Sequence, residues 1–93
     1  MKRRVDDNQD EIVMALREIG CSVQSLASVG SGCPDLLVAW KGEMTLLEVK
    51  NPKVPKSDQQ LTPLEKTWHE AWKGRRIDVV YTIDDAIAAV TGS

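Results

Sequence analysis

Three side chains that can carry out metal-dependent chemistry lie at the ends of two neighbouring apolar stretches. Asp35 opens the stretch 35–40, and Glu48 and Lys50 close the stretch 44–50. Both stretches are short and apolar, and only a three-residue break separates them, so we expect a β-hairpin. Glu48 and Lys50 are two residues apart and therefore share one face of their strand. Carboxylates on two paired strands, with a lysine beside them, can bind a hard divalent metal and a water.

These groups match the needs of metal-dependent phosphodiester hydrolysis. Asp35 and Glu48 offer the oxygen ligands that Mg²⁺ prefers, and the backbone carbonyl of Val49 offers a third. Lys50 would contact the attacking water and the scissile phosphate. A Glu-x-Lys sequence alone also arises as an ion pair on an exposed strand, but here it follows Pro34-Asp35 after 12 intervening residues. The wider pattern therefore favours a nuclease site.

The segment 51–62 follows the expected site directly and shows no regular hydrophobic period. It contains Pro52 and Pro55, so we expect a flexible loop, a common place for contacts to a substrate. An ordinary solvated connection is the alternative. Its lysines would bind flanking phosphates. The candidate DNA contacts in this loop are Lys53, Lys56, Gln59 and Gln60.

The composition is that of one small globular domain. The chain has 93 residues, of which 42% are hydrophobic and 28% are charged, and we expect residues 1–93 to form a single domain. No apolar run approaches membrane-spanning length and the N-terminus lacks an apolar signal segment, so we expect no membrane association and a cytoplasmic location. Cys21 and Cys33 are expected to be free thiols there.

The net charge of −2 does not by itself indicate a protein that binds nucleic acid. Basic residues nevertheless cluster within 2–4, 50–56 and 73–76. An acidic metal site ringed by basic patches suits an enzyme that cuts nucleic acid, because a bound metal offsets part of the negative charge. A solvated surface of mixed charge explains the same distribution, and charge alone favours this simpler interpretation.

Hydrophobic periodicity and capping signals divide the chain into seven elements. Ile12 and Leu16 recur at helical spacing before Gly20, and Thr62-Pro63-x-Glu65 is a capping box that begins a second helix. Residues 1–5 are expected to form a mobile basic arm. The expected elements are a helix over 7–19, strands over 21–27, 35–40 and 44–50, a helix from 63 that Gly74 ends, a strand over 77–82 and a helix over 86–90. This order, αβββαβα, predicts an α/β fold with a mixed sheet and helices on both faces.

The second helix is expected to pack its apolar face into the core. His69, the only histidine, falls on the flank of this helix, where we expect it to be exposed. Glu65 is explained by its place in the capping box, and a further role is left open. Of the apolar residues of this helix, the tryptophans Trp68 and Trp72 are expected in the core because they are four residues apart, and a stacking platform for bases is the alternative. The full apolar face consists of Leu64, Trp68, Ala71 and Trp72.

Glu11 lies at the border of the apolar stripe of the first helix. One interpretation is a surface acid near the helix N-terminus, where the helix dipole favours negative charge. The other is a further carboxylate that reaches toward the metal across the sheet. Spacing alone favours the surface acid.

Several stretches resemble the PD-(D/E)XK nuclease superfamily and, within it, the virus-type replication-repair nuclease (VRR-NUC) family. Pro34-Asp35 and Glu48-Val49-Lys50 are similar to the superfamily motif, and αβββαβ is the superfamily core. The stretches similar to VRR-NUC are Asn8-Gln9-x-Glu11-Ile12-Val13, Gly32-Cys33-Pro34-Asp35-Leu36-Leu37-Val38, Leu46-Leu47-Glu48-Val49-Lys50 and Leu61-Thr62-Pro63-x-Glu65 followed by Trp68. Together they cover most of the chain, and the sequence resembles a stand-alone, phage-type member.

The resemblance implies a restriction-endonuclease-like fold and structure-specific cleavage of DNA with Mg²⁺ or Mn²⁺, without a small-molecule organic cofactor. It also implies that Lys50 is catalytic. Stand-alone members are expected to be homodimers that cut four-way (Holliday) junctions, so branched DNA and a second copy are the expected partners, in the host cytoplasm if the chain is phage-encoded. Many members carry Gln where Glu65 stands, which favours the cap for Glu65. The implied metal ligands are Glu11, Asp35, Glu48 and the Val49 carbonyl.

Two other functions fit parts of the sequence. The first is a non-catalytic nucleic-acid-binding module on the same fold, although such a module would gain little from clustered carboxylates beside phosphate. The second is a protein-interaction module in which Glu48-x-Lys50 arises by chance. Binding of Mn²⁺ through the carboxylates would separate the nuclease from both, because a bound metal stabilises the folded state.

Overall fold

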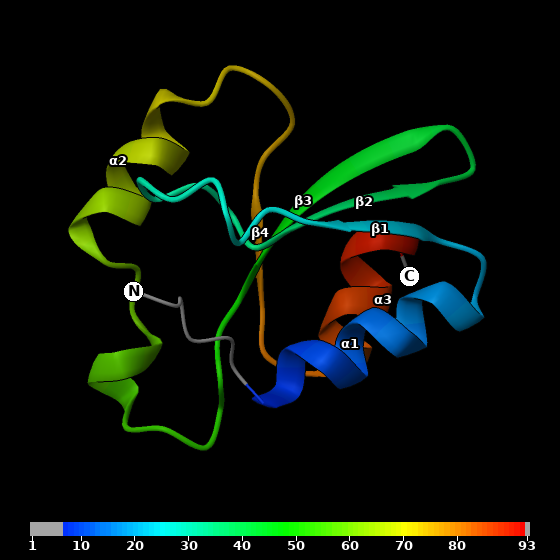
Figure 1. Cartoon of the computed structure of the whole chain (residues 1–93), viewed down its shortest axis with the longest axis horizontal. Coiled ribbons are helices and arrows are strands. Elements are labelled where there is room, and N and C mark those ends of the chain that lie inside the picture. The colour runs from blue at the N-terminus through cyan, green and yellow to red at the C-terminus, as the bar shows by residue number, and fades with distance from the viewer. Residues whose placement is uncertain (1–6, 93) are drawn as a thin grey trace.

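The computed structural model describes residues 7–92, and the predicted arm over residues 1–5 lies outside this range. Its order of elements confirms the predicted αβββαβα arrangement, with one additional 3₁₀ helix (Figure 1). No helix between residues 7 and 92 combines the length and apolarity needed to cross a membrane. The elements are α1 (Asp7–Glu18), β1 (Ser22–Ser25), β2 (Leu36–Trp40), β3 (Glu43–Val49), η1 (Lys56–Gln59), α2 (Pro63–Ala71), β4 (Asp78–Val80) and α3 (Ile83–Thr91).

The strands form one mixed sheet in the order β1-β2-β3-β4. β1, β2 and β3 pair antiparallel, and β4 joins β3 in parallel. Between β2 and β3, Leu36 stands opposite Leu47 and Trp40 stands opposite Glu43, so the expected hairpin is present. The mixed α/β sheet confirms the predicted fold class.

One face of the sheet carries the core. Leu36 and Val38 of β2 and Leu47 and Val49 of β3 alternate onto this face and are buried against α1 and α3. Because side chains alternate along an extended chain, Glu48 and Lys50 point to the opposite face, where two side chains of α2 contact them. The buried side chains contributed by the helices include Ile12, Leu16, Ala86 and Val90.

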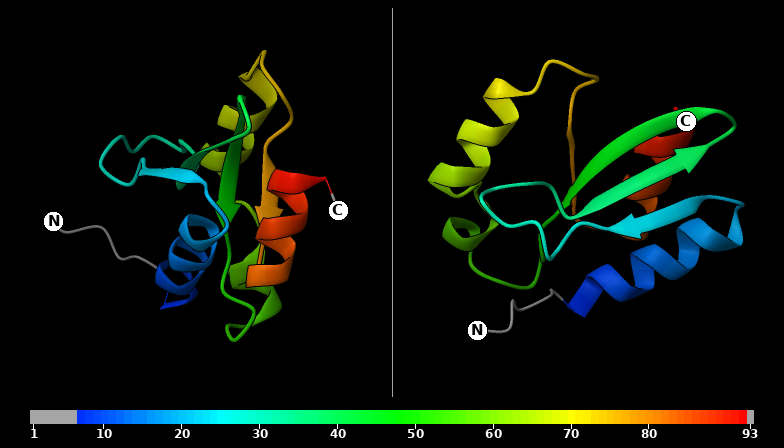
Figure 2. Two further views of the ribbon diagram at one scale, coloured as in Figure 1. Left: turned by 90° about the vertical axis from the view of Figure 1, so that its right-hand side faces the viewer. Right: turned by 45° about the horizontal axis from the view of Figure 1, so that its top comes forward.

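The expectation that both tryptophans of α2 lie in the core is wrong. Figure 2 shows from two directions that α2 stands apart from α1 and α3. Leu64 is 63% exposed and Trp72 is 45% exposed, although Trp68 is partly buried and stacks on Trp72 with ring centroids 4.9 Å apart. A helical period identifies an apolar face but not the element that covers it, so the sequence pattern could not predict that Trp72 is exposed.

The loop between β1 and β2 packs against the first turn of α2. Gly32 has a φ of +85°, and a Cβ atom built there would overlap the backbone carbonyl of Leu64. Both the left-handed backbone and the close approach require glycine. This contact seats the N-terminus of α2 beside the entry to β2.

We expect Gly32→Ala to destabilise the protein more than Gly30→Ala in the same loop. Gly30 also has a positive φ, +74°, but no atom lies within 4 Å of its virtual Cβ. The control therefore carries only the backbone cost of about 1–2 kcal/mol, whereas Gly32→Ala must also displace α2. Urea denaturation of both variants measures the difference, and equal losses would show that the Gly32 contact does not hold α2.

Candidate active site

The Asp35 carboxylate is fixed to the neighbouring strand. Its Oδ2 accepts a hydrogen bond of 2.7 Å from the backbone N–H of Val49, and its own backbone N–H donates to the Leu47 carbonyl at 3.1 Å. Pro34 precedes it and has no N–H to donate, so regular pairing with β3 begins at Asp35. The side chain is therefore held at the entry to β2, directly against the end of β3.

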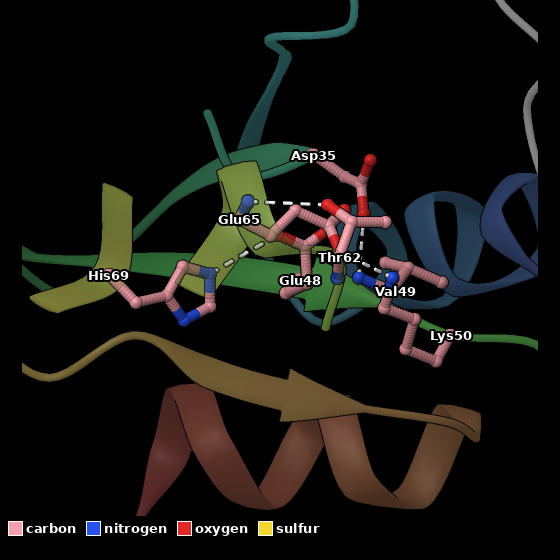
Figure 3. A network of polar contacts seen from close by, with 7 residues as sticks. All are labelled: Asp35, Glu48, Val49, Lys50, Thr62, Glu65 and His69. Atoms are coloured by element: carbon pink, nitrogen blue, oxygen red, sulfur yellow. Dashed lines mark hydrogen bonds and ion pairs between the residues drawn. The ribbon is translucent and has the colours of Figure 1, made fainter. Parts of the chain in front are cut away.

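Glu48 is almost completely buried, with 1% of the residue exposed. Nε2 of His69, from α2, lies 3.2 Å from its Oε1 (Figure 3). Burial is the main cause that raises the pKa of Glu48 to about 10, and a hydrogen bond with Asp35 and the negative charge of Asp35 raise it further. Without a cation, Glu48 is therefore protonated at neutral pH, as expected for one of two carboxyl groups placed together.

Lys50 is held by Glu65 in a buried ion pair. Its Nζ donates to Glu65 Oε1 at 2.7 Å, and the same carboxylate oxygen accepts the backbone N–H of Thr62 at 2.9 Å. Burial alone would raise the pKa of Glu65, but the hydrogen bonds from Lys50 and Thr62 and the charge of Lys50 keep this pKa below its ordinary value. Glu65 therefore remains a carboxylate that fixes the lysine.

Two α2 side chains extend the predicted site. Glu65 has the capping role that the sequence predicted, since Thr62 Oγ1 accepts its backbone N–H at 3.2 Å, but it also binds Lys50. The expectation that His69 is exposed is wrong, because 14% of its side chain is exposed and it contacts Glu48. The available signal was the four-residue spacing of Glu65 and His69, which places them on one face of a helix.

The structure does not bring Glu11 together with the other proposed ligands. Glu11 is exposed and lines a separate cavity of about 520 Å³ whose other lining residues include Asn8, Lys53 and Asp84. Within residues 7–92, no group of three or more His, Cys, Asp or Glu side chains is arranged to hold a metal ion. A metal-binding role for Glu11 thus stays a prediction.

The loop expected to contact DNA is more ordered than the sequence pattern predicted, because it contains η1. Lys53 and Lys56 are exposed. Gln59 Nε2 instead donates to the Val54 carbonyl at 2.8 Å, and Gln60 Nε2 donates to the Lys56 carbonyl at 3.5 Å. The lysines are therefore available to phosphates, whereas the Gln59 amide holds the loop together.

The carboxylate pair fits a hard divalent cation. Asp35 and Glu48 present oxygen atoms close enough to share a hydrogen bond, and the shared site raises the pKa of Glu48. Mg²⁺ is commonly held by only one or two carboxylates and keeps several waters, so a pair is a sufficient protein contribution. The Val49 N–H binds Asp35, and the carbonyl of Val49 stays a predicted third ligand.

The raised pKa of Glu48 predicts how stability depends on pH. The folded protein keeps this proton up to a pH near 10, whereas an unfolded glutamate releases it near pH ~4.3. Between these two pH values the folded state binds more protons than the unfolded state, so the free energy of unfolding falls as the pH rises. We expect the metal-free wild type to lose stability relative to Glu48→Gln from pH 5 to pH 9, by at most about 1.4 kcal/mol per pH unit.

Urea denaturation in chelator at pH 5, 7 and 9 measures this difference, with Glu70→Gln, an exposed α2 position, as the control. A constant difference between wild type and Glu48→Gln across this range would contradict a buried, protonated Glu48.

Comparisons with known proteins agree with this arrangement at the level of the fold. No family model and no curated protein matches the sequence. A solved structure described as "VRR_NUC domain" matches with a TM-score of 0.62 and 23% sequence identity, covering 87% of this chain and 91% of that chain. The match spans nearly all of both chains and is not a shared fragment. The chain therefore has the fold of a VRR_NUC domain, as its motifs predicted.

Proposed function

We propose that this protein is a metal-dependent endodeoxyribonuclease that cuts branched DNA. The observation that carries the proposal is that Asp35 and Glu48 meet at the ends of two paired strands, with Lys50 two residues after Glu48 and directly beyond the end of β3. Burial of two carboxyl groups side by side costs stability and gives no packing benefit, so a functional reason is required. The fold of a VRR_NUC domain supports the same conclusion.

Each group has a distinct task in this chemistry. A Mg²⁺ or Mn²⁺ ion held by Asp35, Glu48 and the Val49 carbonyl would neutralise phosphate charge and lower the pKa of a bound water. Glu65 fixes one side of the Lys50 ammonium, and the remaining N–H donors can contact the scissile phosphate and the attacking water. Lys50 thus supplies a positioned cation where negative charge develops.

Branched DNA and a homodimer are the proposed substrate and assembly. Lys53 and Lys56 are exposed in the segment directly after β3, where they can bind phosphates flanking the cut. A two-fold symmetric dimer would present two such sites to two strands of a four-way junction. A binding module on this fold would need the basic loop but not the acidic pair, because without a metal the pair offers phosphate a negative charge on Asp35 and no cation.

We expect paired nicks in opposing strands of an immobile four-way junction when the protein is present in excess with Mg²⁺ or Mn²⁺, and none in chelator. A linear duplex and a 5′ flap of matching sequence are the parallel substrates. Cleavage of the flap alone would keep the chemistry and reject the symmetric dimer. Tight junction binding without cleavage of any substrate would replace the nuclease by a binding module.

Substitutions at the site separate metal binding from turnover. We expect Asp35→Ala and Glu48→Ala to abolish cleavage because the metal is lost. Lys50→Ala should keep metal binding and lose at least about 100-fold in cleavage rate, as on removal of one preorganised donor. Lys66→Ala, at an exposed α2 position, is the control.

Cleavage rates and calorimetric titration with Mn²⁺ check both expectations. A wild-type cleavage rate in either Asp35→Ala or Glu48→Ala would show that these carboxylates do not form the metal site. Loss of metal binding in Lys50→Ala would assign that lysine a structural role.

A further inference from the structure

The α2 helix contacts two functional side chains at the end of β3, those of Glu48 and of Lys50, the first residue after the strand. Glu65 binds Lys50 at 2.7 Å, and His69 approaches Glu48 to 3.2 Å. Four residues of helix rise about 6 Å, and two residues of strand span about 6.6 Å. A helix lying antiparallel beside the strand can therefore place both contacts in register.

The position of His69 relative to Asp35 defines what the histidine can do. In Figure 3, His69 and Asp35 approach Glu48 from opposite sides. The oxygen atoms that Asp35 and Glu48 could offer together to a cation are on the side of Glu48 that faces Asp35, and the imidazole contacts the other side. His69 is thus placed to hold the far side of the Glu48 carboxyl group.

The contact between His69 and Glu48 is shielded from water. The side chain of Glu48 is 1% exposed and that of His69 is 14% exposed, so water has little access to replace the bond between them. A carboxyl group without a partner on this side could rotate about its terminal torsion, which has broad minima. Loss of a group that holds a metal-ligating carboxylate in this way commonly lowers the metal affinity by about 10–100-fold.

We infer that His69 is a positioning residue that orients the Glu48 carboxylate for divalent-metal binding. This inference rests on the proposed function, because it assigns the Asp35–Glu48 pair a metal. It also gives α2 a definite role, in which Glu65 positions the lysine and His69 positions the metal ligand. Neither the sequence pattern of α2 nor its capping box requires a histidine at this place.

The test is calorimetric titration of the purified full chain with MnCl₂ and, separately, with MgCl₂. We expect His69→Ala to weaken binding of both ions by about 10-fold. His69→Gln should recover most of the loss, because its amide can donate to or accept from Glu48 at a similar reach. Glu70→Ala, at an exposed position one residue further along α2, should bind like wild type.

The measured affinities for the two ions decide whether His69 positions the Glu48 carboxylate. Wild-type affinity in His69→Ala would overturn the inference while leaving the nuclease proposal intact. A loss for Mn²⁺ with no loss for Mg²⁺ would also overturn it, since an imidazole that is itself a ligand favours the softer ion. No binding of either ion by the wild type would overturn both the inference and the metal-dependent function. Circular dichroism of each variant verifies that α2 is retained.

Discussion

The antiparallel register of β2 and β3 decides where every charged group of the site lies. Leu36 and Leu47 stand opposite each other and are completely buried. Asp35, one residue before Leu36, therefore meets Glu48, one residue after Leu47. A slip by one residue would turn the leucines out of the core and move the carboxylates to the wrong face. The hydrophobic core thus fixes the relative position of two acids that would repel each other if both were ionised.

The cost of burying these acids is limited by proton and charge sharing. Lys50 and Glu65 form an ion pair, so together they add no net charge beneath α2. Glu48 keeps a proton in the absence of a cation, because burial and Asp35 raise its pKa to about 10. Binding of a divalent cation must release this proton. The empty site therefore carries the charge of one carboxylate, and the second carboxylate forms only when a metal balances its charge.

Local patterns in the sequence predicted the hairpin, the capping box and the acidic pair, because each depends on residues close together in the chain. The contacts of Lys50 with Glu65 and of Glu48 with His69 join residues 15 and 21 positions apart. They depend on the angle at which α2 docks, which neither periodicity nor capping encodes. The same limit explains the error at Trp72, since an amphipathic helix indicates burial but not its extent. The contact of Gly32 with the Leu64 backbone likewise joins residues far apart in the chain, and no local pattern predicts it.

The proposed metal site at Asp35 and Glu48 can be tested by the anomalous diffraction signal of manganese in crystals of the protein soaked with MnCl₂. We expect a strong anomalous peak in contact with the carboxylates of Asp35 and Glu48 and with the backbone carbonyl of Val49. A peak confined to the cavity that contains Glu11 and Asp84, or no peak at the end of β3, would contradict it.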